Sequence, residues 1–405
     1  MASSRGKTSL FAALAASLLA CSEADDDDSD TNGEDAQSRI ATYNLGLAFG
    51  YVPEASARID PIITALQNAE LDLVCLQELW VDQDDDGEWT TDVIDRVLGG
   101  VADTYPHSYW ARTRVPGDAP EVGCTVEEAD MLLACAEPAC GDEPPDNLAT
   151  CVLAECDAEF QATASACQSC MVTNLGRPLD DIVEACRGVT RGGVVYDGHN
   201  GLAIISRHPL EDTELIELDY ALTARSVLRA TVDLPGAGPT DVYCTHLAAD
   251  LSEEIAYPEG GMFSSFAEEN AVQTERILAE ANSANDSSGD RNVALLGDFN
   301  HGPALGQQRA ELPENYQAVL DAGYESPITQ LDPPRCTFCD DNLLVGRDGP
   351  DGKIIDHVYL RLRDGVTWQD PAIIFDEAIE ITGAGGQPRQ VHLSDHYGVA
   401  VTLSD

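Results

Sequence analysis

One stretch of the sequence decides the fold, Ala294-Leu295-Leu296-Gly297-Asp298-Phe299-Asn300. A short apolar run of this kind predicts a buried strand, and this run ends directly in a carboxylate and an amide. Other predicted strands end in the same way. They end at Asn44, Glu78 and His246, while Asp356 and the pair Asp395-His396 lie in short apolar segments nearer the C-terminus. Polar residues commonly terminate strands, so the information lies in the whole set.

Taken in order, these segments resemble the endonuclease/exonuclease/phosphatase superfamily, in its sphingomyelinase and deoxyribonuclease I-like branch. The most specific parts are Gly297 to Asn300 and Ser394-Asp395-His396, and the match runs from Arg39 to the C-terminus apart from a cysteine-rich stretch. The resemblance implies an α/β fold. It is a four-layer α/β sandwich, in which two packed mixed β-sheets are flanked by helices and the site lies at one edge of the sheets.

The residue types suit hydrolysis of a phosphodiester, which needs charge neutralisation, an activated water and a stabilised leaving group. Metal ligands are expected at Asn44, Glu78 and Asp395, for Mg²⁺ with Mn²⁺ or Ca²⁺ as alternatives. His396 is the expected general base, oriented by Asp356. Asp298 and Asn300 would position the water and the phosphate oxygens. His301 is expected near the mouth of the site.

His246 selects the branch of the family. The segment Thr245-His246-Leu247 resembles the deoxyribonuclease I, sphingomyelinase and inositol-phosphatase-like members, in which this histidine is a second acid/base or phosphate-binding group. We therefore expect His246 to act as a general acid or to stabilise the transition state; a structural histidine at a strand end is the alternative.

Residues 124–186 interrupt the alternation of strands and helices. They hold eight cysteines, with an eleven-residue step at Cys124–Cys135, Cys140–Cys151 and Cys156–Cys167. Eleven residues make about three helical turns, so this stretch predicts a disulfide-rich helical insertion. Zinc bound through Cys167 and Cys170 is the alternative. The pairing cannot be deduced from the sequence. Elsewhere, Cys336 and Cys339 are expected to form a local disulfide, whereas Cys75 and Cys244 are either free thiols or a pair.

The N-terminus is read as a targeting signal. Residues 1–21 combine Arg5 and Lys7 with a short apolar run, and Leu18-Leu19-Ala20-Cys21 resembles a bacterial lipobox with Cys21 as the lipidated residue. Residues 22–38 are an acidic segment that predicts a disordered tether, and residues 39–405 form the main domain. No other apolar stretch approaches a membrane span, so this predicts a lipoprotein of the bacterial outer membrane or cell surface.

An acidic segment near the second predicted strand copies half of an EF-hand loop. Asp82, Asp84 and Asp86 precede Gly87, and Asp92 stands one position before the expected glutamate. The segment predicts a structural Ca²⁺ site at these four aspartates, with a solvated acidic loop as the alternative.

The net charge bears on the substrate. The chain has 22 basic and 72 acidic residues, which gives a formal charge of −50 and opposes docking on nucleic acid or anionic lipid. The sequence therefore predicts an exported Mg²⁺-dependent phosphodiesterase, with a phospholipid head group, as in sphingomyelinase or phospholipase C, favoured as substrate. The alternatives are an extracellular deoxyribonuclease, a sugar or inositol phosphate phosphatase, and a surface protein that binds a partner through the insertion.

Overall fold

The computed structural model describes residues 36–81, 90–113, 121–188, 190–191, 194–259, 262–288, 291–345, 352–383 and 386–405. The predicted signal segment, Cys21 and most of the predicted tether lie outside these residues, and the first strand begins at Gln37. Asp82, Asp84 and Asp86 also lie outside them, while Asp92 is the first residue of helix α2. The lipid anchor and the calcium site therefore stay predictions. No helix in the described ranges is both long and apolar enough to cross a membrane.

Two mixed sheets form the centre of the fold. One sheet has the strand order β14 (Thr367–Ile374), β17 (Gly398–Ser404), β1 (Gln37–Leu47), β2 (Leu73–Leu79), β6 (Ala203–Ser206) and β3 (His107–Tyr109). The other has the order β13 (Asp356–Arg361), β10 (Asn292–Asp298), β9 (Gly238–His246), β8 (Ser226–Leu234) and β7 (Glu211–Glu217). Each sheet contains one parallel pair, β1 with β2 and β9 with β10, and its other pairs are antiparallel.

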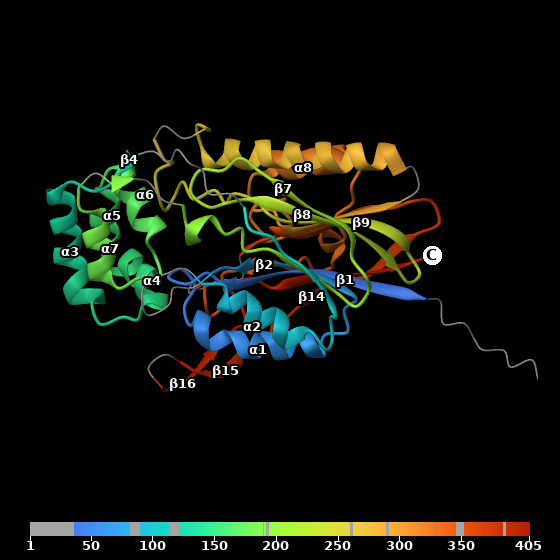
Figure 1. The fold of residues 1–405 in the computed structure, drawn as a ribbon, viewed down its shortest axis with the longest axis horizontal. Coiled ribbons are helices and arrows are strands. Elements are labelled where there is room, and N and C mark those ends of the chain that lie inside the picture. The colour runs from blue at the N-terminus through green and yellow to red at the C-terminus, as the bar shows by residue number, and fades with distance from the viewer. Residues whose placement is uncertain are drawn as a thin grey trace, which may run out of the picture. The chain divides into compact units, whose positions relative to one another are not determined.

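Helices cover the outer faces of both sheets. Figure 1 shows α1 (Ala55–Asn68) and α2 (Asp92–Val101) along the first sheet, and α8 (Phe266–Ser288) along β7 to β9. Helix α9 (Pro313–Asp321) packs beside α8. Short ladders pair β4 (Glu121–Val122) with β5 (Thr190–Arg191), β11 (Phe338–Cys339) with β12 (Gly352–Lys353), and β15 (Ile379–Thr382) with β16 (Pro388–Val391). Two 3₁₀ turns, η1 (Tyr196–Gly198) and η2 (Pro327–Gln330), complete the elements.

The alternation of side chains along the strands produces the four layers. On β10, Ala294 and Leu296 join the core between the two sheets, whereas Val293 and Leu295 join the core beneath α8 and α9. Successive strand residues point to opposite faces, so an uninterrupted apolar run is what a strand covered on both sides requires. The predicted four-layer α/β sandwich is confirmed.

The predicted helical insertion is also confirmed. It consists of α3 (Val126–Cys140), α4 (Pro145–Glu155), α5 (Asp157–Gln161), α6 (Ser165–Thr173) and α7 (Leu179–Cys186), which gather together in Figure 1. Its disulfides are Cys124–Cys167, Cys135–Cys156, Cys140–Cys151 and Cys170–Cys186. The zinc alternative is wrong, because Cys167 and Cys170 are each bonded to a different cysteine. Of the three eleven-residue steps, only the one between Cys140 and Cys151 is itself a disulfide.

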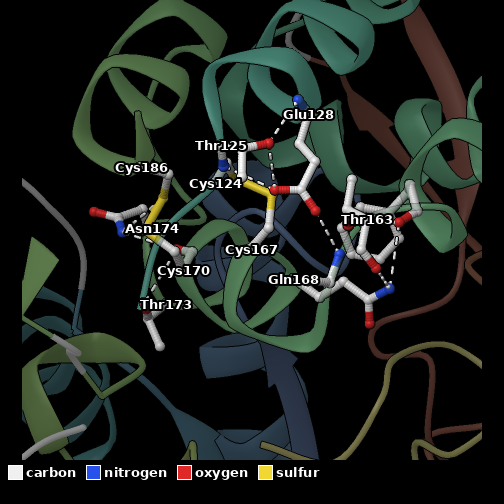
Figure 2. The surroundings of a disulfide bond; sticks show 12 residues. Cys124, Thr125, Glu128, Thr163, Cys167, Gln168, Cys170, Thr173, Asn174 and Cys186 are labelled. Atoms are coloured by element: carbon white, nitrogen blue, oxygen red, sulfur yellow. Dashed lines mark hydrogen bonds between the residues drawn. A yellow bond between two sulfur atoms is a disulfide. The ribbon is translucent and has the colours of Figure 1, made fainter. Parts of the chain in front are cut away.

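Hydrogen bonds add to these covalent links inside the insertion. Thr125 and Glu128 form a capping box at the start of α3, and the second carboxylate oxygen of Glu128 accepts a bond of 2.7 Å from the backbone N–H of Ala164. Figure 2 shows this link beside the Cys124–Cys167 disulfide. The start of α3 is therefore fixed to the start of α6 by one covalent bond and one charged hydrogen bond.

A further disulfide joins the two sheets. Cys75 on β2 and Cys244 on β9 are fully buried in the core between the sheets, with their Cα atoms 5.3 Å apart. The sequence left open whether Cys75 and Cys244 are free thiols or a pair, and the structure shows that they form a disulfide. The expected local disulfide, Cys336–Cys339, is present as well.

We predict that the sheet-to-sheet disulfide stabilises the domain far more than the local one. The first is formed by residues 169 positions apart and the second by residues 3 apart, and closing a longer loop removes more entropy from the unfolded chain. Cys75→Ala with Cys244→Ala should lower the free energy of unfolding by about 2–5 kcal/mol in guanidinium titrations. Cys336→Ala with Cys339→Ala is the matched control, and equal losses in the two double variants would contradict the prediction.

Candidate active site

The predicted site residues meet at one edge of the two sheets. Asn44 lies near the end of β1, Glu78 near the end of β2, and His246 and Asp298 end β9 and β10. Both pairs of strands are parallel, so their carboxyl ends meet at the same edge. Asp356 begins β13 opposite Asp298, because that strand runs the other way. Asp395 and His396 precede β17, which is antiparallel to β1.

The side-chain amide of Asn44 connects the two sheets at this edge. It donates to Glu78 Oε1 at 3.1 Å and to Asp298 Oδ2 at 3.0 Å, while its oxygen accepts from the backbone N–H of Gly46. Asn44 is fully buried. One amide therefore fixes two carboxylates that come from different sheets.

His396 forms a dyad with Asp356. Its Nδ1 lies 2.9 Å from Asp356 Oδ2, and its Nε2 lies 3.7 Å from Asp298 Oδ2. Burial lowers the pKa of His396, but the carboxylates of Asp356 and Asp298 outweigh it and raise this pKa well above the ordinary value. A cation beside Asp298 would offset that carboxylate, which is the condition under which the imidazole can accept a proton.

His246 has the opposite character. Its Nε2 lies 3.5 Å from Asp298 Oδ2, and among the described residues its buried Nδ1 has no hydrogen-bond partner. Burial, and then the charges of Arg225 and His396, lower the pKa of His246 well below its ordinary value. This imidazole is therefore neutral at pH 7, so it can donate a hydrogen bond without carrying charge.

The backbone is bent where these groups approach one another. Glu78 and Asn300 have positive φ angles of 52° and 49°, which side-chain-bearing residues rarely adopt and which concentrate at functional sites. Gly46 has φ 56°, and a Cβ there would lie 2.3 Å from Asp395 Oδ1. Only glycine lets the loop that carries Asp395 lie against β1.

Two side chains, those of Asn342 and Arg58, hold the loop that carries His396. Asn342 donates to the carbonyls of Ser394 and Asp395 at 2.9 and 3.2 Å. Arg58 on α1 is fully buried and donates to the carbonyls of Leu393 at 2.7 Å and Leu45 at 3.1 Å, and also to that of Gly46. This arginine therefore joins the end of β1 to the segment before Asp395.

The residues fit a divalent cation. Burial and the neighbouring Asp395 raise the pKa of Glu78 to about 7, and burial and Asp356 raise that of Asp298 to about 7. Within the described part of the chain, Glu78 Oε2 has no hydrogen-bond partner. Crowded carboxylates with raised pKa values and an unused oxygen suit a hard cation. Asp298, Asp356 and His396 also offer ligand atoms within 4.8 Å of one another, although His396 Nδ1 is already bonded to Asp356.

A pocket of about 550 Å³ opens over these groups. Its walls include the predicted residues Glu78, His246, Asp298, Asn300, Asp395 and His396. Asn44 and Asp356 do not line it and support the lining groups from behind. His301 is not near the mouth as expected. It is fully buried and bonded to Asn270 and Tyr359, because its side chain points to the opposite side of the chain from Asn300.

Sequence reasoning missed Arg225, Tyr51 and Trp80, which also line the pocket. Arg225 is largely buried just before β8, and its Nη1 has no hydrogen-bond partner among the described residues. Burial lowers the pKa of Arg225, which the charges of Glu269, Asp298 and Glu78 oppose. An arginine before an apolar strand resembles an ordinary strand end, so the local pattern gives no signal of this position.

Phe338 and the Cys336–Cys339 disulfide shape another side of the pocket. Phe338 lines the pocket, and its ring centroid lies 5.0 Å from that of His396. Between the two cysteines, the hydroxyl of Thr337 accepts from the backbone N–H of Asp356 at 3.1 Å. This short loop therefore contacts both members of the dyad.

Comparison with known proteins identifies the family. The model of the Endonuclease/Exonuclease/phosphatase family matches residues 41–396. The chain belongs to this family. The matched range contains all the strand-end residues described above, from Asn44 to His396. Members of the family act on phosphoester bonds.

Solved structures share the fold of this family member. SmcL has a TM-score of 0.53 at 14% identity, covering 91% of this chain and 99% of its own. An endonuclease/exonuclease/phosphatase from Beutenbergia cavernae has a TM-score of 0.51 at 17% identity, and the match covers 91% of this chain and 72% of that protein. Sphingomyelinase C from Streptomyces griseocarneus has a TM-score of 0.50 at 15% identity, and the match covers 91% of this chain and 99% of that protein. Among curated proteins, no sequence matches this chain.

We predict that replacing Glu78 with glutamine stabilises the metal-free protein and abolishes its stabilisation by Mg²⁺. A raised pKa means that the folded state disfavours the ionised carboxylate, so at about pH 8 the charge costs stability that glutamine recovers, and the gain should vanish towards about pH 4. Thermal melts with and without Mg²⁺ measure both effects, and Mg²⁺ at 100 times its Kd should stabilise the parent by about 2.7 kcal/mol.

Glu253→Gln is the matched control, because Glu253 is an exposed carboxylate on the wall of the same pocket. Equal responses to Mg²⁺ in the two variants would contradict a metal site at Glu78.

Proposed function

We propose that this chain is an exported, divalent-metal-dependent phosphodiesterase that acts on a phospholipid head group. The observation that supports the reaction type is the convergence of Glu78, His246, Asp298 and His396 on one pocket, with Asn44 bonded to two of them from behind. These residues come from different strands of both sheets and offer, within one space, cation ligands, a base and neutral donors.

The proposed mechanism assigns one role to each group. Glu78, with Asn44 and Asp395 beside it, would hold Mg²⁺, which when bound neutralises charge on the phosphoryl oxygens. His396 takes a proton from the attacking water, and Asp356 keeps its Nδ1–H oriented and stabilises the imidazolium that forms. Asp298 accepts a hydrogen bond from that water. Asn300 and Arg225 face the phosphoryl oxygens from the pocket wall.

His246 has the role of a donor to the leaving oxygen. Its lowered pKa keeps the ring neutral, so it stabilises negative charge that develops in the transition state through a hydrogen bond. The two histidines thus have pKa values displaced in opposite directions, which is a pattern that separates a base from a donor within one site.

The substrate preference rests on charge. Asp250, Glu253, Glu254 and Glu311 line the pocket along with the site carboxylates. Apart from Arg225, which the mechanism uses, the arginine and the lysine on its wall are paired: Arg309 with Asp340, and Lys353 with Glu311. Such a wall repels a polyanion but tolerates a phosphodiester whose own charge is balanced by a cationic head group. A zwitterionic phospholipid meets that condition better than DNA does.

The disulfides support export. In the described ranges, twelve cysteines form six disulfides, as expected of a protein that matures outside the reducing cytoplasm. We further propose lipidation at Cys21, with the chain held at the bacterial outer membrane or cell surface. One named sphingomyelinase C shares the fold, although at 15% identity this likeness speaks for the fold and not for the substrate.

The function is tested on residues 22–405 produced under oxidising conditions. Sphingomyelin, phosphatidylcholine, plasmid DNA and an aryl phosphodiester are offered with Mg²⁺ or with a chelator. We expect Mg²⁺-dependent release of the phosphorylated head group, and a loss of at least about 10²-fold in kcat for His396→Ala. Turnover that survives the chelator, or a fully active His396→Ala protein, would overturn the mechanism; faster hydrolysis of DNA would overturn the substrate.

Arg225 offers a second kinetic prediction. Because its guanidinium is buried with an unpaired Nη1 beside the pocket, Arg225→Gln should lower kcat by about 10²-fold, as loss of a preorganised donor to a developing charge does. Arg309→Gln removes a cation from the same pocket wall that is already paired with Asp340, and should change kcat by less than about threefold. Steady-state kinetics on the aryl phosphodiester compare the two, and similar losses would refute a special role for Arg225.

A further inference from the structure

A second cavity lies between the helical insertion and the main domain. It has a volume of about 180 Å³ and lies among α3 to α7 on one side and Tyr51 with residues 251–255 on the other. The atoms that face it are apolar. Its side chains include Leu148 and Val152 of α4, Phe160 of α5, Met171 of α6 and Ile182 of α7. The helices of the insertion pack against one another through these apolar faces and also direct part of them into this space.

This apolar cavity adjoins the active-site pocket. Tyr51, Leu251 and Glu254 line both spaces, so the cavity and the pocket meet at these three residues. The burial of Tyr51 and the charge of Glu78 raise the pKa of its phenol, which is therefore neutral. A molecule in the apolar cavity therefore lies next to the pocket that holds the site carboxylates.

The cavity is fixed in place. The disulfides Cys135–Cys156, Cys140–Cys151 and Cys170–Cys186 connect the helices around it. Hydrogen bonds seat the insertion on the main domain: Gln161 donates to the carbonyl of Glu254 at 2.6 Å, and Gln168 accepts from the N–H of Ala256 at 2.8 Å. These bonds restrict the relative movement of the helices around the cavity.

The shape and position of the cavity point to one occupant. An apolar cavity of roughly 150 Å³ accepts the six carbons of benzene, so one of about 180 Å³ holds an aliphatic segment of roughly six or seven carbons. Leu153 lines the cavity and is 41% exposed, so the cavity reaches the surface at this residue. Two chains of a bilayer lipid would not fit.

We infer that the apolar cavity binds the single aliphatic chain of the substrate, so that the enzyme takes monomeric single-chain phosphodiester lipids. This inference rests on the proposed function and specifies its substrate class. Because the chain and the scissile phosphate occupy adjoining spaces, binding of the chain positions the phosphodiester in the active site. The insertion thereby contributes specificity, while the chemistry stays with the residues at the sheet edge.

The test is a chain-length series of choline phosphodiesters, from glycerophosphocholine to lysophosphatidylcholines with acyl chains of up to about twelve carbons, all below their micelle-forming concentrations. We expect kcat/KM to rise by up to about fourfold per methylene, until the cavity is full. Two variants change the cavity in opposite directions. Ala149→Phe fills it and should abolish the dependence on chain length, whereas Met171→Ala enlarges it and should move the optimum to longer chains.

Ala154→Phe is the matched control, because Ala154 lies exposed on the same helix and does not line the cavity. Unchanged turnover of glycerophosphocholine by Ala149→Phe verifies that this variant folds. Calorimetric binding of decylphosphocholine to His396→Ala, with and without Ala149→Phe, gives a measurement that does not need catalysis; we expect binding that the added phenyl ring weakens at least tenfold.

The outcomes separate the two proposals. Turnover of head-group esters without any dependence on chain length would overturn the inference and leave the proposed function intact. Faster hydrolysis of two-chain lipids in vesicles than of monomers would overturn it as well. Binding of decylphosphocholine without hydrolysis of any phosphodiester would overturn the proposed function, and with it the assignment of the chain to a substrate.

Discussion

The amide of Asn44 is the contact on which the arrangement of the site depends. It is the group that touches carboxylates from both sheets, Glu78 on one and Asp298 on the other. Two like charges in a buried place repel each other, and the sandwich holds them close because a neutral donor lies between them. Neutral groups also orient the dyad without adding charge: the hydroxyl of Thr337 accepts from the backbone N–H of Asp356, and the amide of Asn342 donates to the loop of His396. The carboxylates of Glu78 and Asp298 therefore keep negative charge that would suit a divalent cation.

The sequence predicted the fold and most of the site because both depend on local patterns. Apolar runs that end in polar residues are visible in one dimension, and the topology of two parallel pairs brings those ends together. His301 was misjudged since neighbours along a chain point to different sides. Arg225 and Tyr51 were missed because their importance comes from what surrounds them in space. The disulfide pairing in the insertion was beyond reach, because many pairings satisfy the same spacing.

The insertion interrupts the sequence of the sandwich without interrupting its sheets. It is held together by its own disulfides and by the capping box of α3, and its buried side chains continue the core beneath the first sheet. Its contacts with the main domain are concentrated at Tyr51 and at residues 251–256, next to the pocket.

The bond between Cys75 and Cys244 has a consequence for motion. The bridge lies three residues before Glu78 and two before His246, so it anchors the two strands that deliver opposite walls of the site. Partial opening of the domain must then begin elsewhere, at the outer helices or the edge strands β3 and β7, while the middle of the sandwich stays closed. Amide hydrogens of β2 and β9 would be the last to exchange with solvent, and the geometry of the site would outlive much of the structure around it.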